Sequence, residues 1–422
     1  MRRRAFIQLT AALMGAMPLS LRADDETRAK ASIVIIGGGF AGATCARYLR
    51  RVDPAIHVIL IDEQRKYLAC PMSNWVIGGV GRMERLQVNR AGLARAGVEQ
   101  IHDRVDAVDG LNRQVTLAGG RKLGYDRLVM APGVDFKWGS PEGYDEAAAL
   151  RMPHAWRAGE QTVLLHKQLQ AMKDGGVVAI SVPAAPFRCP PGPYERASLI
   201  AHYLKTHKPR SKVLILDAND KFAKQALFKE AWSTLYPGMI EWVPVTEGGA
   251  VRRVDAKTMT LYTELEDHKV DVANVIPAQT AGRLAISAGL AEDSGWCAAD
   301  SSIFESKRMS GVHVIGDACI ANPMPKSASA ANSQAKNCAL AIAALVSGVA
   351  PGSPSLHNTC YSLVAPEYGI SVNEIFQVID GKITLVEGAG GISPLNAAAE
   401  FRAREAAYDR SWYESIVADS FG

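Results

Sequence analysis

The stretch SIVIIGGGFAG, residues 32–42, limits the folds open to this chain more than any other. Its apolar β-branched run is typical of a strand that is buried on both faces. Gly37, Gly39 and Gly42 follow in the spacing G-x-G-x-x-G, which permits a tight turn, lets backbone approach a pyrophosphate and lets the next helix pack on the strand. The stretch therefore predicts a buried strand, a phosphate-binding turn and a helix over residues 41–51.

A second apolar run, residues 58–61, ends in Asp62 and Glu63. The distance from the glycine turn is the one at which an acidic side chain meets a ribose hydroxyl, which makes Asp62 a predicted cofactor contact. Strand, turn, helix, strand and acid thus occur in the order that a dinucleotide-binding unit requires. A glycine-rich turn without a ligand is the alternative that only a structure can exclude.

Two further segments, residues 125–133 (YDRLVMAPG) and 312–317 (VHVIGD), are predicted to be strands that return the chain to the nucleotide. This pairing of an early and a late segment resembles the two-dinucleotide flavoproteins, in which the late Asp reaches the ribityl and pyrophosphate part of FAD. The resemblance implies FAD rather than NAD. The residues it places beside the cofactor are Ala131, Gly133, Gly316 and Asp317.

A second strand and helix unit begins at residues 176–182 (GVVAISV) and continues with a strand over 213–216. Its connecting loop, PAAPFRCPPGPYERAS, contains five prolines where a nicotinamide site would carry glycines. Proline lacks the backbone N–H that cradles a phosphate, so we expect the architecture without nicotinamide binding. A degenerate site that binds NAD weakly is the alternative.

Cys189 lies in this proline-rich loop, next to Arg188 and at the expected start of a helix that runs through residues 196–204. Because arginine and a helix N-terminus both stabilise a thiolate, we expect the pKa of Cys189 to be lowered. Glu195 is either a favourable charge at the helix start or a proton acceptor beside the sulfur. Cys70, in an irregular stretch after the ribose-binding acid, is either a packing residue or a contact to the reactive end of the cofactor.

An alanine-rich helix is expected after Asp317, with its positive end facing a flavin ring. Lys326 is predicted to contact the cofactor there, with Ser327 and Asn332 as the other polar residues at this end. The final segment, residues 351–422, contains Cys360, strand-like runs and an aromatic end, which indicates a third, smaller domain.

The composition and charge limit which classes of protein this chain can belong to. The chain has 422 residues, of which 48% are apolar and 21% charged, and a formal charge of +4 with scattered cations. These values fit two or three globular domains and disfavour a nucleic-acid surface, and no metal site is predicted. Residues 1–31 are expected to be an export signal that resembles the twin-arginine type, with cleavage at Ala23 or Ala31 and a periplasmic destination. An ordinary secretory signal and a membrane anchor are the alternatives, although Pro18 breaks a stretch already short for a span.

Several motifs across the whole mature chain resemble the flavoprotein subunit of flavocytochrome c sulfide dehydrogenase: YLACPMSNWVIGG, PHAWRAGEQT, AAPFRCPPGPYERAS, HVIGDACIANPMPKS, NTCYSLVAPEYGIS and SWYESIVADSFG. The resemblance implies a thioether from Cys70 to FAD and a redox-active disulfide between Cys189 and Cys360. Hydrosulfide would attack this disulfide, and Glu195 would accept the proton. The electrons would then pass through FAD to a c-type, dihaem cytochrome subunit.

The haem must come from a partner, because the chain has no C-x-x-C-H motif. We expect the partner to dock on the C-terminal domain near Trp412 and Tyr413. A sulfide:quinone reductase is the nearest alternative, but its C-terminal pair of amphipathic helices is not evident in the sequence. A pyridine-nucleotide disulfide reductase and an accessory flavoprotein of a thiosulfate-oxidising system are the others.

The expected fold class is α/β, with two Rossmann-like dinucleotide-binding domains of the FAD-dependent disulfide reductase type and a small C-terminal α+β domain. The expected FAD domain covers residues 32–145 and 270–350, the second Rossmann-like domain 146–269, and the C-terminal, cytochrome-facing domain 351–422. No role is assigned to Cys45, Cys297, Cys319 and Cys338.

Overall fold

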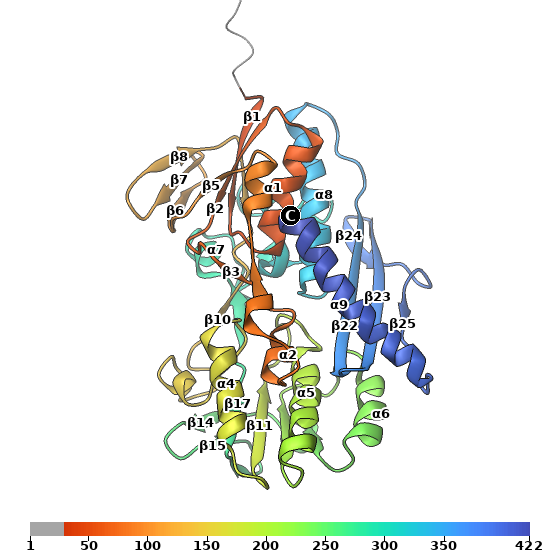
Figure 1. Ribbon diagram of the computed structural model, residues 1–422. Helices are drawn as coiled ribbons and strands as arrows, with labels where there is room; N and C mark the ends of the chain where they lie inside the picture. The colour runs from red at the N-terminus through yellow and green to blue at the C-terminus, as the bar shows by residue number, and fades with distance from the viewer. Residues whose placement is uncertain (1–28) are drawn as a thin grey trace, which may run out of the picture.

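The computed structural model describes residues 29–422, and it arranges them as two sheet-and-helix units with a third unit along one side (Figure 1). The predicted export signal lies almost wholly outside the described residues. Its expected end at residue 31 needs correction, because Ala31 is already the first residue of strand β1 (Ala31–Ile36) and pairs with Ile56. The first unit therefore begins at or before Ala31.

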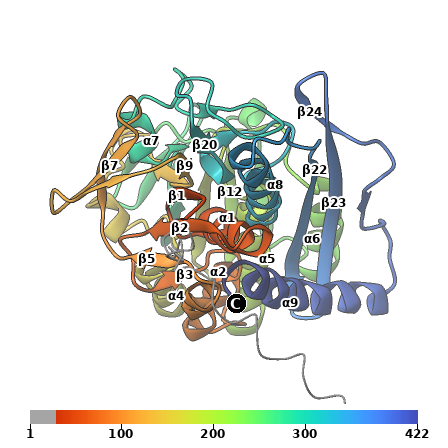
Figure 2. The ribbon, with the colours of Figure 1, turned by 90° about the horizontal axis from the view of Figure 1, so that it is seen from above.

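The first unit is built on a five-stranded parallel sheet in the order β20-β9-β1-β2-β5. Its central strand, β1, is buried. Ile33, Val34 and Ile35 expose no surface to solvent, as expected from the apolar run. Helices α1 (Phe40–Val52) and α8 (Ala328–Val346) lie side by side against this sheet in both ribbon views (Figures 1 and 2). The remaining strands are β2 (Ile56–Ile61), β5 (Glu99–Ile101), β9 (Arg127–Met130) and β20 (Val312–Val314).

Short elements complete this unit between its second and fourth strands. Strands β6 (Val105–Asp109), β7 (Gln114–Leu117) and β8 (Lys122–Gly124) form an antiparallel meander that projects from the main sheet (Figure 1). A short helix, α2 (Ser73–Ile77), reaches down to contact the second unit. The two units are also joined by an antiparallel pair, β10 (Val134–Phe136) and β18 (Gln279–Ala281).

The second unit has a four-stranded parallel sheet in the order β13-β12-β11-β17. Because β17 (Val272–Val275) pairs with β11 (Val177–Val182), this unit extends beyond the boundary expected at residue 269. Its other strands and helices are β12 (Lys212–Asp217), β13 (Ile240–Val243), α4 (Glu160–Ala171), α5 (Gly192–His207) and α6 (Gln225–Leu235). Helix α5 begins three residues after Cys189, carries Glu195 in its first turn as expected, and continues past Leu204.

The C-terminal unit combines an antiparallel sheet with one long helix, in agreement with the expected α+β class. Strands β22 (Ser355–Ala365), β23 (Tyr368–Ile379) and β24 (Lys382–Leu385) pair in sequence, and helix α9 (Ala399–Phe421) packs against β23 and α1. Figure 2 shows the sheet standing beside the first unit, with α9 running along its lower edge. A C-terminal pair of amphipathic helices was not evident in the sequence. The structure has one helix, α9, after the strands of this unit.

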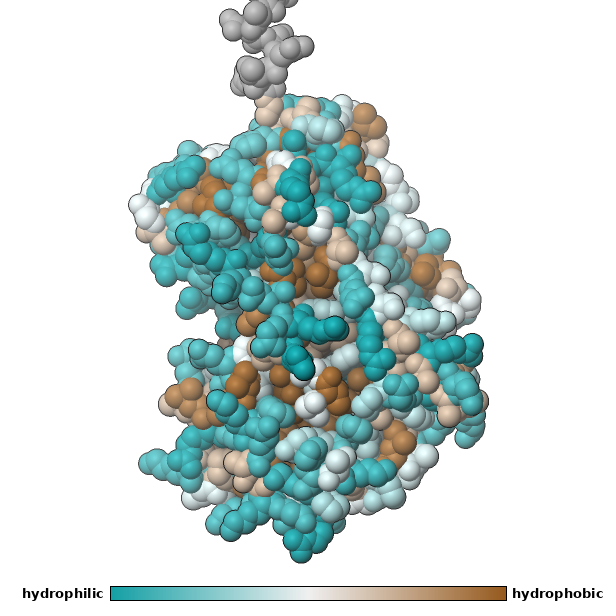
Figure 3. All heavy atoms as spheres, viewed as in Figure 1, coloured by the Kyte–Doolittle hydropathy of each residue, from teal (hydrophilic) through white to brown (hydrophobic). Residues whose placement is uncertain are grey.

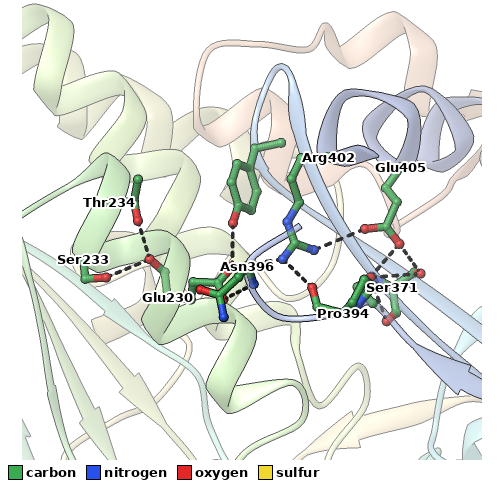
Figure 4. Close-up of polar contacts among 10 residues, drawn as sticks. Glu230, Ser233, Thr234, Ser371, Pro394, Asn396, Arg402 and Glu405 are labelled. Carbon is green, nitrogen blue, oxygen red and sulfur yellow. Dashed lines mark hydrogen bonds and ion pairs between the residues drawn. The ribbon is translucent and has the colours of Figure 1, made fainter. Parts of the chain in front are cut away.

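A buried arginine joins the C-terminal unit to the second unit (Figure 4). The Arg402 side chain on α9 is 1% exposed, and it donates to Glu230 on α6 at 3.0 Å and to the carbonyl oxygen of Pro394 at 2.7 Å. Glu405 lies beside it and accepts hydrogen bonds from Ser371 and Ser393, both at 2.6 Å. A charge buried this deeply needs such partners, so the network fixes α9 relative to α6.

The surface view in Figure 3 shows a mainly hydrophilic face on which apolar side chains gather in small patches, several of them across the middle of the molecule. Within residues 29–422, none of the helices combines the length and the apolar character needed to cross a membrane.

Candidate active site

One cavity of about 1170 Å³ runs between the units, and it is lined by segments from all three. A volume of this size exceeds the 300–1,000 Å³ usual for small-ligand sites and suits an extended dinucleotide. Most of the predicted site residues line it together, although they come from distant parts of the chain. They are Gly37, Gly39, Asp62, Cys70, Ala131, Gly133, Cys189, Glu195, Gly316, Asp317 and Cys360.

The glycine turn at the N-terminus of α1 has no room for side chains. Gly37 has a positive φ of +99°, and a Cβ there would lie 2.2 Å from the carbonyl oxygen of Ala131. A Cβ on Gly42 would lie 1.8 Å from the carbonyl oxygen of Gly37, so this glycine serves the close packing of helix and strand and does not line the cavity. The turn thus leaves a helix N-terminus open toward the cavity, as pyrophosphate binding requires.

Asp62 follows β2 at the cavity wall, where the ribose-binding acid was predicted. Its carboxylate accepts hydrogen bonds from the backbone N–H of Gly38 at 2.6 Å and of Gln64 at 2.7 Å. It also receives a hydrogen bond of 3.1 Å from Arg90, whose guanidinium lies over the ring of Tyr67. Sequence reasoning missed Arg90, since it lies in an irregular segment without a motif.

Asp317 supplies the clearest sign of a missing partner in the cavity. Its Oδ1 atom is buried and has no hydrogen-bond partner among the described residues. Burial raises the pKa of this carboxyl, although Arg188 and Lys326 oppose the shift. Because buried acceptors are almost always satisfied, this oxygen fits a ligand hydroxyl such as those of the ribityl chain. The turn, the acid after β2 and this oxygen together fit FAD.

The structure does not place Lys326 on the cavity, contrary to its predicted role as a cofactor contact. Its ammonium donates to the carbonyl oxygens of Asp317 at 2.7 Å and Cys319 at 2.9 Å, and it lies over the ring of Trp296 at 3.8 Å. These contacts hold the loop after β20 in shape. Lys326 therefore supports the loop that forms part of the cavity wall and does not line the cavity itself.

Cys70 lines the cavity at the end of a short extended segment, on the side where the flavin ring is expected. Its Sγ lies 3.9 Å from the carbonyl oxygen of Trp156, which also accepts a hydrogen bond from Arg188. The Cys70 thiol is half-buried and is not paired with another cysteine. This position is compatible with a bond to a cofactor that fills the cavity.

Cys189 and Cys360 are brought to the same part of the cavity from α5's leading loop and from β22. Both are free, half-buried thiols in the structure. Cys189 has a left-handed backbone, with φ of +58°, a conformation that costs free energy for a residue with a side chain. Lys224 lies beside Cys360, with its Nζ 3.9 Å from the Sγ atom.

The expected low pKa of Cys189 was wrong for the free thiol. Burial raises the pKa of Cys189, and the charges of Cys360 and Glu195 raise it further, whereas Arg188 lowers it less. The loop carries the sulfur into a desolvated site, so the loss of hydration outweighs the neighbouring cation.

Glu195 ties the two cysteine-bearing segments together. Its side chain is 7% exposed, and it accepts hydrogen bonds from Asn74 at 3.0 Å and from the backbone N–H of Leu363 at 3.1 Å. Leu363 is three residues beyond Cys360 on the same strand. Burial raises the pKa of Glu195, although both hydrogen bonds and Lys224 oppose the shift. A carboxyl with a raised pKa suits a group that gains and loses a proton near neutral pH.

Two further buried side chains near Glu195, Arg196 and Asp409, were not singled out from the sequence. Arg196 is 1% exposed and donates to Asn74 at 2.9 Å and Asn274 at 2.8 Å, and its guanidinium lies over the ring of Trp156. Asp409 on α9 lines the cavity with a buried Oδ2 that has no partner among the described residues. Only tertiary packing brings these groups to the site.

The expected docking surface near Trp412 and Tyr413 needs correction. Tyr413 is 9% exposed and donates a 3.2 Å hydrogen bond to the carbonyl oxygen of Arg85, so it is a packing residue. Trp412 is half-buried and lines the cavity. Neither residue offers the exposed aromatic surface that the prediction required.

Three family models match the chain. Residues 31–170 match the pyridine nucleotide-disulphide oxidoreductase model. Residues 162–277 match the central domain of the sulfide dehydrogenase (flavocytochrome c) flavoprotein chain, and residues 352–421 match the flavin-binding domain of flavocytochrome c sulphide dehydrogenase. The cavity therefore lies where all three matched segments meet.

Individual relatives agree with these matches. A flavocytochrome c sulfide dehydrogenase flavoprotein chain from Chlorobaculum thiosulfatiphilum is 48% identical over 44 residues, which cover 10% of this chain and 92% of the relative. Mitochondrial sulfide:quinone oxidoreductase from Mus musculus is 24% identical over 346 residues, covering 78% of this chain and 74% of the relative.

The solved structure of the sulfide:quinone oxidoreductase from Aquifex aeolicus has a similar fold, with a TM-score of 0.73 at 17% identity and 92% coverage of both chains. This likeness shows the architecture of an FAD-dependent reductase and confirms the predicted fold class. The family matches and the Chlorobaculum relative identify the chain as a flavin-dependent oxidoreductase that belongs to the family of flavocytochrome c sulfide dehydrogenase flavoprotein chains.

Proposed function

We propose that this chain oxidises hydrosulfide at a disulfide formed by Cys189 and Cys360, and that the electrons leave through FAD to a c-type cytochrome subunit. The observation that carries this proposal is the meeting of Cys70, Cys189, Cys360 and Glu195 on one cavity with a dinucleotide-type glycine turn.

The Cys189–Cys360 disulfide is the first electron acceptor in this proposal. Hydrosulfide attacks one sulfur, a new S–S bond forms, and the Cys189–Cys360 bond breaks. The attacked cysteine becomes a persulfide, and the other leaves as a thiolate with the electron pair of the broken bond. The sulfide sulfur is oxidised and the protein disulfide is reduced, while Glu195 accepts the proton.

FAD, when bound, accepts two electrons and releases them singly, which suits a haem acceptor. The residues that would hold it are the glycine turn with Gly37 and Gly39, Asp62 at the ribose, and Asp317 near the ribityl chain. We propose that Cys70 holds the flavin through a thioether, which prevents its loss. The N-terminus of α8 faces the cavity through Ser327, Ala328 and Ser329 and favours negative charge there.

The partner would be a c-type, dihaem cytochrome subunit, and the site of reaction would be the periplasm, reached by twin-arginine export. The Chlorobaculum relative is named as the flavoprotein chain of a flavocytochrome, which supports this choice. The export proposal rests on the basic and apolar pattern of residues 1–31.

A quinone is the second candidate acceptor, because relatives named sulfide:quinone oxidoreductases match 346 residues of the chain. An electron-acceptor assay separates the two. Fast sulfide-driven reduction of cytochrome c, with no reduction of a short-chain quinone, supports the cytochrome proposal, and the reverse result contradicts it.

The flavin linkage has its own test. The purified protein is precipitated with acid, and the pellet is digested and analysed by mass spectrometry. We expect yellow colour in the pellet and flavin mass on the peptide that contains Cys70. Flavin released to the supernatant would contradict the thioether and reopen the quinone alternative.

A further inference from the structure

Lys224 is a buried cation whose ammonium contacts Cys360, one of the two cysteines. It is the N-cap of α6, its side chain is 6% exposed, and its backbone is left-handed, with φ of +62°. Its ammonium donates to the carbonyl oxygen of Cys360 at 3.0 Å and to Ser362 Oγ at 2.8 Å. The third donor faces Cys360 Sγ at 3.9 Å, so all three ammonium donors are used within one stretch of β22.

The surroundings of Cys189 differ in charge. Its neighbour Arg188 donates to the carbonyl oxygen of Trp156. After burial, the strongest influences on the pKa of Cys189 are Cys360 and Glu195, which raise it, while Arg188 and then Lys224 lower it less. At Cys360, by contrast, the strongest influence after burial is Lys224, which lowers the pKa of that thiol, and Glu195, Asp409 and Glu374 oppose it. The two sulfurs are therefore not equivalent.

We propose that Lys224 makes Cys360 the leaving sulfur and thereby directs hydrosulfide to Cys189. This inference rests on the proposed function, since it assumes the Cys189–Cys360 disulfide. The attacking sulfur bonds to Cys189 Sγ and keeps its proton until Glu195 accepts it. The Cys189–Cys360 bond breaks, and its electron pair leaves with Cys360 as a thiolate that pairs with the Lys224 ammonium.

The chemistry of thiol exchange supports this direction. The thiol of lower pKa is the better leaving group, and a neighbouring ammonium stabilises the developing thiolate in a desolvated site. The leaving thiolate is also well placed for the next step, because Thr359, next to Cys360, donates its N–H to Ser329 at the start of α8 at 2.9 Å. The cavity end at which a flavin ring is expected is therefore adjacent to Cys360.

The Arg402 network explains how Lys224 is held in place. Glu230 lies on the same helix as Lys224, and Arg402 and the backbone N–H of Asn396 bind its carboxylate. The Arg402 network thus holds the middle of α6 against the C-terminal unit, and the contacts of Lys224 with Cys360 and Ser362 hold its start against β22. Lys224 is a positioning residue for the reaction in this proposal, acting through Cys360.

The first experiment locates the persulfide. Oxidised holoprotein receives one equivalent of sulfide without oxygen, is quenched and alkylated with a maleimide, and is mapped by mass spectrometry. We expect the additional sulfur on Cys189 and direct alkylation of Cys360. In Lys224→Met this preference should fall and persulfide formation should slow roughly tenfold, whereas Lys224→Arg, which keeps the charge, should stay close to wild type. Additional sulfur on Cys360 in the wild type would overturn the inference.

The second experiment needs no sulfide. The rate of alkylation of Cys360 in the reduced protein is measured against pH, and its midpoint should rise by roughly one unit or more in Lys224→Met. The exposed Lys221→Met is the matched control and should leave the midpoint unchanged. An unchanged midpoint in Lys224→Met overturns the role of Lys224. Absence of a persulfide on both cysteines overturns the proposed function instead, while this titration still decides the role of Lys224.

Discussion

The backbone N–H of Cys189 donates a 2.7 Å hydrogen bond to the carbonyl oxygen of Lys326. The bond joins the proline-rich loop of the second unit to the loop that precedes α8 in the first. The Lys326 ammonium holds the loop before α8 in place by donating a hydrogen bond to the carbonyl oxygen of Asp317. One residue therefore connects the position of the reactive sulfur to the position of the unpartnered carboxyl that fits FAD.

Serine in place of either Cys189 or Cys360 should abolish the bleaching of the flavin by sulfide, because hydroxyl oxygen cannot form the disulfide. The flavin content should remain that of the wild type, since neither residue belongs to the glycine turn. Stopped-flow absorbance measures the bleaching. Cys45→Ala is the control, because Cys45 is fully buried away from the cavity. Bleaching at the wild-type rate in Cys189→Ser would show that the disulfide is not the site of attack.

Glu195→Gln should slow sulfide-driven flavin reduction by roughly 10²–10⁴-fold, the range for loss of a general base. Burial raises the pKa of Glu195, so in the wild type the rate should fall as the pH drops through this raised value and the carboxylate becomes protonated. The variant should lack that limb of the pH profile. A profile of unchanged shape would contradict the role of Glu195 as proton acceptor, and thermal unfolding checks that the variant is folded.

Gly37→Ala should yield protein with almost no flavin. The added Cβ would lie 2.2 Å from the carbonyl oxygen of Ala131 at a φ of +99°, so the turn must open. The ratio of flavin to protein absorbance measures the loss. Gly119→Ala is the matched control, since a Cβ there would meet nothing within 4 Å and the backbone is not left-handed. Normal flavin content in Gly37→Ala would show that the turn does not hold the cofactor.

Acid should destabilise the protein partly through His313, a fully buried residue of strand β20, which pairs with β9 in the first sheet. Burial lowers the pKa of His313 from 6.5 to about 4, so the unfolded chain binds a proton that the folded chain refuses. The free energy of unfolding should therefore fall as the pH drops from about 6.5 to about 4, by about 2 kcal/mol from this residue. Urea unfolding at pH 7 and pH 4.5 measures it.

The matched variants for this test are His313→Asn and His102→Asn. The first should lose part of the pH dependence, because asparagine takes up no proton in either state. The second replaces an exposed histidine and should keep the full dependence. Equal slopes in all three proteins would contradict the assignment to His313.

Arg402→Met should lower the free energy of unfolding by about 3–5 kcal/mol, because it leaves Glu230 and Glu405 without their buried cation. Arg252→Met is the control, since its ion pair with Glu264 is well exposed and should contribute less than about 1 kcal/mol. Denaturant unfolding compares the two. Equal effects would show that the network in Figure 4 does not join the C-terminal unit to α6.

The prediction from sequence succeeded where the signal is local. The apolar run, the glycine spacing and the acid after β2 lie within about thirty residues, and they were found as β1, α1, β2 and Asp62. The late strand with Asp317 was found for the same reason, because strand and turn preferences depend on adjacent residues. The cysteines were identified through motifs that resemble a family, not through their own spacing.

The errors came from side-chain direction and from burial. Lys326 and Tyr413 are polar or aromatic residues in suggestive segments, but the first turns behind the cavity wall and the second packs inside. The charge next to Cys189 indicated a low pKa, whereas desolvation raises it. Sequence shows which charges are adjacent in the chain but not how much water surrounds them.

The sequence by itself determined the dinucleotide turn, the succession of strand, helix and strand around it, and the residue types available for sulfur chemistry. These follow from backbone sterics and apolar periodicity, which act over a few residues. Only the tertiary structure decided that Cys70, Cys189 and Cys360 share one cavity, and that the Lys224 ammonium contacts Cys360. Such contacts join residues more than a hundred positions apart, so they are fixed by the packing of whole units and not by any local pattern.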